Sequence, residues 1–367
     1  MEAIRILHIV PNMQAGGLES FIMNIYRNID RNKVQFDFLY HYKGDYFFDD
    51  EIKKMGGRIY NLTVRQDNNI LKYKRDLLNF FKGHKEYKVV HSHMPSLGFL
   101  HLKVAQNNGV KVRLLHSHTS SFEKSLKGYT KFLLSRFSVK YSSHRLACSL
   151  NAGKYLFKNN DFKVINNAID SKRFIFDINI RENIRKKLDI SDKFVVGHIG
   201  RFVPTKNHLF LIDIFYEILR EKENAILLLI GDGNVKSDIE YEVKKLGIEK
   251  NIIFYGVSDK VEDLLQAMDI FILPSLFEGL GMVLIEAQTS GLKCFTSSGV
   301  VPNEAKISDN IEYISLNENP TFWAKNILKY YDGYERKNML QNVYINNYDI
   351  NKISNDMEKF YISNHNL

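Results

Sequence analysis

Residues 270–287 read IFILPSLFEGLGMVLIEA, and this stretch decides the fold. The apolar run over 270–274 predicts a buried strand, and the glycines that follow predict a turn. The apolar residues around Glu286 predict a helix that packs inward. A strand, a turn and a helix in this order form the repeating unit of parallel α/β sheets, so the stretch predicts an α/β fold.

The same alternation of strand and helix patterns runs along the whole chain in two series. The first series predicts strands near 4–11, 36–40, 58–62, 88–93, 112–117, 145–149 and 163–167, and the second near 194–200, 225–231, 252–255, 270–274, 293–297 and 311–315. Two such series predict two α/β domains with parallel sheets. We place the domains at 1–170 and 171–340, followed by a helical segment at 341–367.

The composition is that of a globular protein. Apolar residues make up 44% of the 367 residues and charged residues 25%, which excludes a disordered or fibrous chain. No apolar run reaches the roughly 18 residues of a membrane-spanning helix. The N-terminal MEAIRILHIVPN is too short in its apolar part, and too weakly basic, for a signal peptide. We expect a cytoplasmic protein, with peripheral binding to the inner face of the membrane as a further expectation.

The charge balance indicates the kind of binding partner, and the cysteines indicate whether disulfides or zinc stabilise the fold. Fifty-one basic minus 42 acidic residues gives a net charge of +9, which favours a polyanion: nucleic acid, a phosphorylated small molecule or an anionic membrane. Zinc-finger spacing and RNA-binding signatures are absent, so we expect no nucleic acid. Cys148 and Cys294 form no CxxC pair, which argues against a disulfide framework or structural zinc.

Ligands of open parallel sheets bind beyond the carboxyl ends of the strands, so the residues after each strand are the candidates for a site. Gly16 and Gly17 follow the first strand and precede a helix. Such glycines let a phosphate approach backbone N–H groups, although paired glycines are also ordinary turn residues. The chain contains neither the GxGxxG fingerprint nor a P-loop.

Histidines end two neighbouring strands, in His91-Ser92-His93 and His116-Ser117-His118. Surface or capping histidines are one interpretation. We favour hydrogen bonding to a substrate over metal binding, which would require convergent geometry and usually a carboxylate.

The strand over 194–200 leads into GRFVPTKN, residues 200–207. Arg201 and Lys206 thus share one loop before a helix, and two cations at a strand end can bind a diphosphate. Two solvated surface cations are the alternative. Glu278 lies in the glycine turn after the strand over 270–274, and Glu286 lies eight residues later. A carboxylate among apolar neighbours requires a partner, and ribose hydroxyls or a cation would serve.

These motifs, taken in this order, resemble those of the retaining glycosyltransferases of family 4. The resemblance rests on the E-x7-E pair in FEGLGMVLIEA, the GR…KN loop, the glycine pair after the first strand, and Asn167-Ala168-Ile169-Asp170 at the domain junction. It implies the GT-B fold, in which two Rossmann-like domains face each other across a cleft. The C-terminal segment would cross back to the N-terminal domain, which lies on the acceptor side.

The resemblance also implies roles for individual residues. Arg201 and Lys206 would hold the diphosphate, Glu278 would contact the donor sugar, and Glu286 would bind the ribose. The remaining contacts to the nucleotide sugar would come from Gly16, Gly17, Gly279, Leu280, Gly281 and Met282, with the base near Gly256 and Val257. His118 would lie near the reacting sugar, with His116 as the alternative.

The implied function is transfer of a hexose or N-acetylhexosamine from a nucleotide donor, expected to be UDP-linked, to a glycan or lipid-linked acceptor. The pathway would build a capsule, an exopolysaccharide or a related glycoconjugate. No Asp-x-Asp occurs in the chain, and two cations are available for the diphosphate, which favours a metal-independent mechanism without a cofactor. The alternatives are a sugar-nucleotide epimerase or small-molecule glycoside synthase on the same fold, and a non-catalytic subunit that binds polyanions.

The segment 124–145 has the pattern of an amphipathic helix. Leu126, Tyr129, Leu133, Phe137 and Tyr141 share one side, whereas Lys124, Lys127, Lys131 and Arg145 share another. This pattern is typical of a helix on an anionic membrane surface. A helix that packs its apolar side on the sheet, with the cations in water, is the alternative and is slightly favoured.

Overall fold

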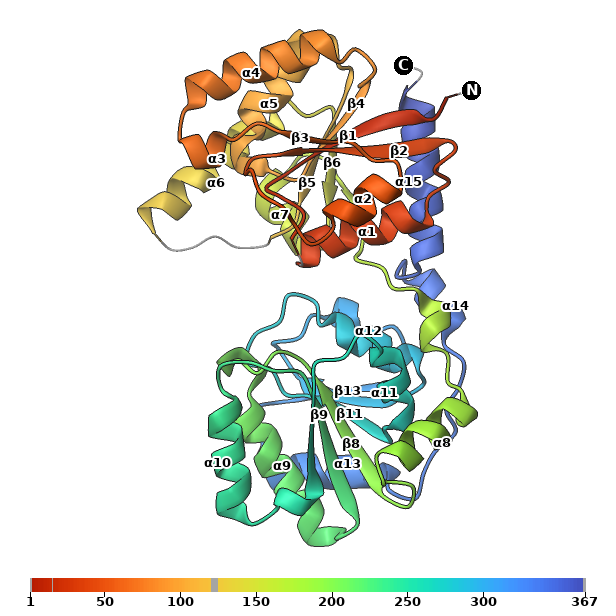
Figure 1. The fold of residues 1–367 in the computed structure, drawn as a ribbon. Coiled ribbons are helices and arrows are strands. Elements are labelled where there is room, and N and C mark those ends of the chain that lie inside the picture. Colours follow the sequence, from red (N-terminus) through yellow and green to blue (C-terminus); the bar gives the residue numbers. More distant parts are fainter. Residues whose placement is uncertain (1, 15, 120–124, 366–367) are drawn as a thin grey trace. The chain divides into compact units, whose positions relative to one another are not determined.

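The computed structural model describes residues 2–14, 16–119 and 125–365, which divide into two compact α/β units (Figure 1). Unit 1 comprises residues 1–169 and 349–367, and unit 2 comprises residues 170–348. Within the described residues, each unit is built around one parallel sheet. The expectation of two α/β domains with parallel sheets is confirmed.

The sheet of unit 1 has the strand order β3-β2-β1-β4-β5-β6-β7. Its strands are β1 Ile4–Val10, β2 Val34–Tyr40, β3 Ile59–Asn61, β4 Val89–Ser92, β5 Val112–Ser117, β6 His144–Ala147 and β7 Lys163–Val164. Its helices are α1 Gly17–Asn28, α2 Asp49–Lys54, α3 Val64–Asp67, α4 Ile70–Gly83, α5 Pro95–Asn107, α6 Leu126–Val139, α7 Leu150–Phe157 and α15 Ile350–His365. The order reverses between β1 and β4, and this switch point is where open α/β sheets bind ligands.

The sheet of unit 2 has the order β10-β9-β8-β11-β12-β13, with its switch point between β8 and β11. Its strands are β8 Phe194–Ile199, β9 Ala225–Ile230, β10 Ile252–Gly256, β11 Ile270–Leu273, β12 Lys293–Ser297 and β13 Ile311–Ile314. Its helices are α8 Ile178–Lys187, α9 His208–Glu221, α10 Lys236–Leu246, α11 Val261–Ala267, α12 Met282–Thr289, α13 Pro320–Ile327 and α14 Leu340–Ile345, together with the 3₁₀ turns η1 Ser171–Phe174 and η2 Pro204–Lys206.

Alternation along the strands gives the sheet of unit 1 two buried faces. Ile6 and Phe36 contribute to the core on the face covered by α1 and α15, whereas Leu7 and Leu39 contribute to the core on the other face. The unit 2 strand β9 reads AILLLI and is buried throughout, as expected for a strand covered on both faces. Apolar burial on both faces therefore holds each sheet between its helices.

The chain leaves unit 1 once and returns once. Ile169 and Asp349 form an isolated parallel bridge, and the N–H of Ile350 donates to the carbonyl of Ile169 at 2.9 Å. The return therefore begins at residue 349, eight residues after the expected start at 341, because α14 packs against α12 and η1 in unit 2. From Ile350 onward, α15 runs along the strands of unit 1 (Figure 1).

The expected helix over 124–145 is shorter in the structure. Lys124 lies outside the described residues, and α6 ends at Val139. Arg145 belongs to β6, where it pairs in register with Leu115 of β5, so it is not on the helix. The chain turns back after Val139 because β6 must join the sheet. Among the described residues, no helix is both long enough and apolar enough to cross a membrane.

Candidate active site

Two loops of unit 2 meet at the switch point of its sheet, because β8 and β11 are neighbours and both loops leave their carboxyl ends. The loop after β8 carries Arg201 and η2, and the loop after β11 carries Glu278. The N–H of Leu276 donates to the carbonyl of Thr205 at 2.8 Å, and Nδ2 of Asn207 donates to the carbonyl of Pro274 at 3.1 Å. These backbone contacts fix the two loops against each other.

The same loops bring two of the predicted site residues into direct contact. Lys206 Nζ forms an ion pair with Glu278 Oε1, which also accepts a hydrogen bond from Ser275 Oγ at 2.7 Å. The Glu278 side chain is only 8% exposed and that of Lys206 19% exposed. A largely desolvated ammonium beside a carboxylate can bind phosphate oxygens on one side while the carboxylate accepts hydroxyls on the other. The sequence did not point to Ser275, since a serine after a strand is common.

Arg201 lies in the same loop but makes no ion pair among the described residues. Its side chain is exposed, and its carbonyl accepts a hydrogen bond from Val203 N–H at 2.9 Å. Arg201 is therefore available to a ligand, whereas Lys206 is held in place by Glu278.

Helix α12 begins directly after the glycine turn. Gly281 is its N-cap and has a φ of +77°, a left-handed conformation that glycine adopts without strain. Gly279 is exposed and Leu280 is half-buried, so the turn is open at the start of the helix. N–H groups in the first turn of a helix generally have no intrahelical acceptor and suit an anion, although the N–H of Leu284 here donates to the carbonyl of Gly281 at 2.8 Å.

Glu286 lies one turn into α12 and is half-buried. Its carboxylate makes no hydrogen bond with the described residues. Burial and, to a smaller extent, the nearby charge of Glu262 raise the pKa of Glu286 to about 7, against an opposing effect of Arg173. Arg173 is itself hydrogen-bonded to Glu262, Nε to Oε1, at 3.1 Å. The structure thus leaves a partly desolvated carboxylate that lacks the partner expected from the sequence.

The residues predicted to lie near the base are at the end of the edge strand β10. Gly256 has a φ of +82°, and its carbonyl accepts a hydrogen bond from Gly231 N–H at 2.8 Å. Val257 follows and is 78% exposed. An exposed apolar residue after a glycine turn is available to pack on a planar ring.

In unit 1, the glycine pair lies at the start of α1, after β1. A Cβ at Gly16 would clash with the carboxylate of Glu19, which folds back over the start of the helix, whereas nothing crowds Gly17. Burial raises the pKa of Glu19. The space expected for an approaching phosphate is therefore open at Gly17 and taken by a carboxylate at Gly16.

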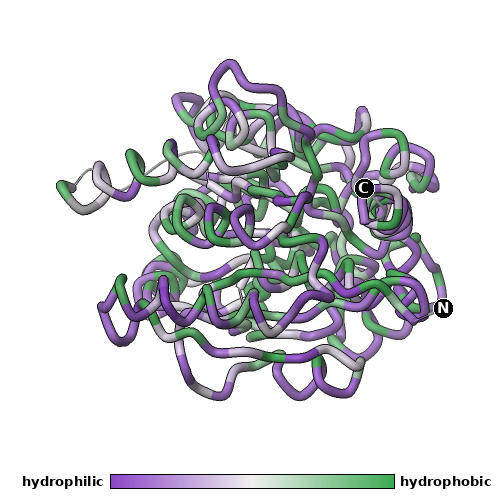
Figure 2. Tube along the Cα trace, turned by 90° about the horizontal axis from the view of Figure 1, so that it is seen from above, coloured by the Kyte–Doolittle hydropathy of each residue, from purple (hydrophilic) through white to green (hydrophobic). Residues whose placement is uncertain are grey.

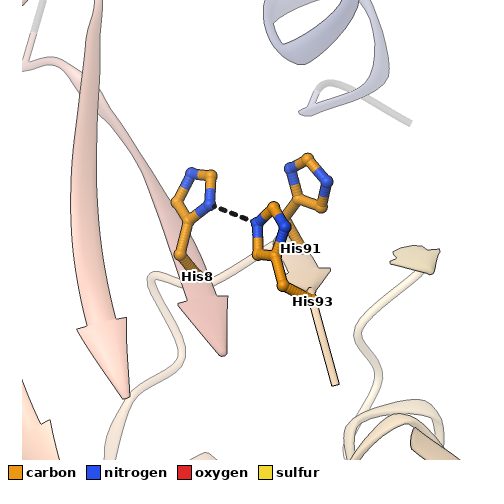
Figure 3. A group of neighbouring side chains, drawn as sticks. All are labelled: His8, His91 and His93. Atoms are coloured by element: carbon orange, nitrogen blue, oxygen red, sulfur yellow. Dashed lines mark hydrogen bonds between the residues drawn. The ribbon is translucent and has the colours of Figure 1, made fainter. Parts of the chain in front are cut away.

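The histidines at the ends of β4 and β5, two in the strands and two directly after them, lie on the face of the sheet covered by α1 and α15, and His8 of β1 joins them. His8 pairs in register with His91, and Nδ1 of His8 is hydrogen-bonded to Nε2 of His93 at 3.0 Å (Figure 3). Nδ1 of His93 is in turn hydrogen-bonded to Nε2 of His118 at 2.9 Å. The sequence analysis did not weigh His8, although a histidine inside the apolar strand IRILHIV was a visible signal.

A second set of contacts runs beside the first. Nδ1 of His91 is hydrogen-bonded to the hydroxyl of Tyr361 at 2.8 Å, and Nε2 of His91 to Nδ1 of His116 at 3.2 Å. His116 is fully buried and faces Phe21, whereas His118 is only half-buried. Of the two alternatives, His118 is therefore the histidine that a substrate can reach.

Burial keeps these rings neutral. It lowers the pKa of His8 and of His118 to about 3, and it lowers the pKa values of His91, His93 and His116, with further lowering from the neighbouring histidines. Ligand nitrogens of His8, His91 and His93, and likewise of His93, His116 and His118, lie within 4.8 Å of one another. That spacing would also allow a metal ion, but the nitrogens described above already pair with one another.

Two parallel-sheet units, with candidate residues at the carboxyl ends of their strands, are the architecture of the GT-B fold. Two family models match the chain: Glycosyltransferase Family 4 over residues 15–173 and Glycosyl transferases group 1 over residues 180–346. The protein is a family 4 glycosyltransferase.

Individual relatives agree with this assignment. The chain is 31% identical over 335 residues to a putative glycosyltransferase, EpsF, of Bacillus subtilis, covering 89% of this chain and 87% of the relative. It is 26% identical to the UDP-Gal:alpha-D-GlcNAc-diphosphoundecaprenol alpha-1,3-galactosyltransferase of Escherichia coli, over 71% of each chain. The fold is similar to that of HepE from Anabaena, crystallised in complex with UDP, with a TM-score of 0.78, 17% identity, and coverage of 98% of this chain and 100% of HepE.

Proposed function

We propose that this glycosyltransferase transfers a hexose or N-acetylhexosamine from a UDP-linked donor, with retention of configuration, to a lipid-linked glycan in polysaccharide or glycoconjugate biosynthesis. The observation that carries the donor site is the Lys206–Glu278 pair at the switch point of unit 2. Glu286, a half-buried carboxylate without a described partner, supports binding of the ribose hydroxyls. The donor nucleotide is chosen because the Escherichia coli relative uses UDP-Gal and HepE was crystallised with UDP.

The reaction breaks the bond between the sugar C1 and the diphosphate oxygen and forms a bond from C1 to the acceptor oxygen on the same face. The acceptor proton passes to a phosphate oxygen of the leaving UDP. Arg201 and Lys206 stabilise the charge that develops there, and no cofactor or metal ion is needed for this step. Glu278 orients the sugar through its hydroxyls, and His118 donates a hydrogen bond to the substrate, a role carried over from the family motif.

The acceptor site is assigned to unit 1 on the basis of α6. Leu126, Tyr129, Leu133 and Phe137 form the α6 stripe, and they are exposed rather than packed on the sheet, Leu126 at 83% and Phe137 at 64%. Figure 2 shows this helix at the left, where apolar and polar segments alternate along it. An exposed apolar stripe next to Lys131 suits the interface of an anionic membrane, where a lipid-linked acceptor would be found.

A pocket beside α6 supports the same assignment. Its volume is about 250 Å³, and its lining includes Ser117 at the end of β5, Phe132 of α6 and Tyr155 of α7. The pocket combines hydroxyls with aromatic rings, a combination typical of sugar-binding sites. It lies one residue from His118 along the chain.

Two measurements test this function. Purified protein incubated with a panel of UDP-sugars should slowly release UDP from one of them, and the rate should rise with an undecaprenyl-diphosphate-linked sugar. Absence of release from every UDP-sugar, together with release from a GDP- or ADP-sugar, would overturn the choice of nucleotide.

The membrane part is tested by co-sedimentation with vesicles of phosphatidylglycerol or of phosphatidylcholine. Binding should require the anionic lipid and should be lost in Leu133→Glu/Phe137→Glu. The matched control is Tyr241→Glu, which changes a side chain of unit 2 that is 70% exposed. Equal binding of both variants to anionic vesicles would contradict a role for the α6 stripe.

A further inference from the structure

The histidine chain that ends at His118 extends deep into unit 1. It runs from His8 through His93 to His118, with contacts of 3.0 and 2.9 Å. At its buried end, Nε2 of His8 has no hydrogen-bond partner among the described residues, and the ring lies 4.2 Å from that of Phe36. At its other end, Nε2 of His118 is bonded to His93, and Nδ1, which makes no hydrogen bond with residues 2–14, 16–119 and 125–365, is the nitrogen we assign to a ligand.

We propose that His93 and His8 are positioning residues that hold His118 as the neutral Nδ1–H tautomer, so that this N–H donates to a hydroxyl of the substrate. The proposal deepens the proposed function and rests on it for the contact between His118 and the sugar.

The direction in which the three histidines donate hydrogen bonds follows from counting the protons on their nitrogens. A neutral imidazole has one N–H and one lone pair, so each ring in a chain donates in the same direction as the previous one. If Nδ1 of His8 donates to Nε2 of His93, then Nδ1 of His93 donates to Nε2 of His118, and the proton of His118 must be on Nδ1. The opposite direction would leave the N–H of His8 Nε2 buried without an acceptor. Buried N–H groups without partners are rarer than unfilled acceptors, which favours the first direction.

The buried environment keeps the three histidines of this hydrogen-bonded chain neutral and holds their rings in place. Burial lowers the pKa values of His8, His93 and His118, so that a proton added to one ring is not retained near neutral pH. Phe36 on one side and Phe21 on the other, with ring centroids 4.2 Å from His8 and 5.7 Å from His118, limit rotation of the end rings. A histidine outside such a chain would exchange between its two tautomers.

The second chain provides a matched control. It runs from the Tyr361 hydroxyl through His91 to His116 and ends at Nε2 of His116, which is buried and has no hydrogen-bond partner in the part of the chain that the structure describes. His91 and His93 lie two residues apart, and both are buried, with ring centroids 4.2 Å apart. A purely structural role would make their substitutions equivalent, whereas the proposal separates them.

The test is the tautomer itself, read by two-bond ¹H–¹⁵N correlation NMR of protein labelled with ¹⁵N-histidine. In the wild type, His118 should give the Nδ1–H pattern. In His93→Phe the Nε2–H form should appear, and turnover should fall roughly tenfold, about the effect of one misdirected hydrogen bond. UDP affinity should stay within a factor of about two, since one hydrogen bond to the sugar is not used by UDP. His93→Gln, which can accept and donate, should restore the wild-type tautomer, and His91→Phe should leave it unchanged.

Several outcomes would overturn the proposal. An Nε2–H pattern for His118 in the wild type would do so even if no variant folded. An equal shift in His91→Phe and His93→Phe would show a packing effect, and stoichiometric metal bound by the cluster would show that the nitrogens are ligands. Failure of the proposed function is distinguishable: His118→Ala would then leave turnover unchanged, although His118 of the wild-type protein still gave the Nδ1–H pattern.

Discussion

Lowering the pH from 7 to 5 is expected to destabilise unit 1 through its buried histidines. Burial lowers the pKa of His8 and of His101 from 6.5 to about 3. The unfolded chain therefore takes up a proton on each ring below pH 6.5, whereas the folded chain does not until near pH 3. The contribution of these neutral rings to the free energy of unfolding is therefore complete above pH 6.5 and is lost progressively as the pH falls toward 3.

The magnitude follows from proton linkage. For a histidine with these two pKa values, the free energy of unfolding at pH 5 is about 2 kcal/mol lower than at pH 7. His8 and His101 together account for about 4 kcal/mol, against a typical total of about 5–15 kcal/mol for a domain. The pKa values of His41, His91, His93 and His116 are lowered in the same direction and add to this loss.

Hydrogen exchange measured by mass spectrometry on peptides from β1, β4 and β5 gives the opening free energy of unit 1 at each pH, after correction for intrinsic exchange. His8→Phe should reduce the difference between pH 7 and pH 5 by about 2 kcal/mol, because one linked proton is removed. Phenylalanine suits the site beside Phe36 and Phe38, and comparison at pH 8 isolates any packing effect. His101→Gln, outside the histidine chains, should give the same reduction. A pH dependence identical in wild type and both variants would refute the reasoning.

Three further predictions concern the site. Glu278→Gln should weaken binding or turnover of the sugar nucleotide while sparing UDP, whereas Glu286→Gln should weaken both; calorimetry that finds wild-type UDP affinity in Glu286→Gln would exclude the ribose role. Lys206→Ala should lower turnover by about 10²–10³ and should also weaken UDP binding. His118→Ala should lower turnover strongly and leave UDP affinity nearly unchanged. Steady-state kinetics and calorimetry measure these two quantities. Activity should persist in EDTA, and complete loss that Mg²⁺ or Mn²⁺ restores would contradict the metal-independent mechanism.

The strands were predictable because they are short apolar runs between turn residues, a local signal that burial on both faces of a parallel sheet imposes. The junction after Asn166 was equally local. The residue at which the chain returns to unit 1 was not predictable in this way. The pattern around residue 345 indicates a helix, but it does not indicate which unit the helix packs against. What decides it is the bridge between Ile169 and Asp349, a contact between positions 180 residues apart.

The α6 stripe shows a second limit of the sequence. Its spacing predicts a helix with one apolar side, but the same spacing describes a helix packed on a sheet and a helix on a membrane. The sequence favoured packing. In the structure the small residue Gly98 of α5 lets α6 approach closely through Ser138, whose hydroxyl donates to the carbonyl of Pro95 at 2.6 Å, and the large apolar side chains face outward. The inward face of α6 is therefore set by close contact at small residues together with Val139 and Phe132, and the α6 stripe is left outside.

The candidate site also has a part that the sequence could predict and a part that depends on the fold. Glu278, Lys206 and the glycine turn follow strands, and their motifs are contiguous, so the sequence could find them. That Lys206 pairs with Glu278 depends on β8 lying beside β11, which a sequence pattern does not encode residue by residue. The histidines of unit 1 show most clearly that site contacts depend on the strand order and on the returning helix. His91-Ser92-His93 and His116-Ser117-His118 are local signals, but their partners His8 and Tyr361 come from β1 and from α15. Register brings His8 opposite His91, and the returning helix brings the Tyr361 hydroxyl to the same ring. The tautomer proposed for His118 therefore depends on a residue of β1, and the neighbouring hydrogen-bonded set of His91 and His116 ends on a residue of α15, neither of which a local pattern around the histidine pairs reveals.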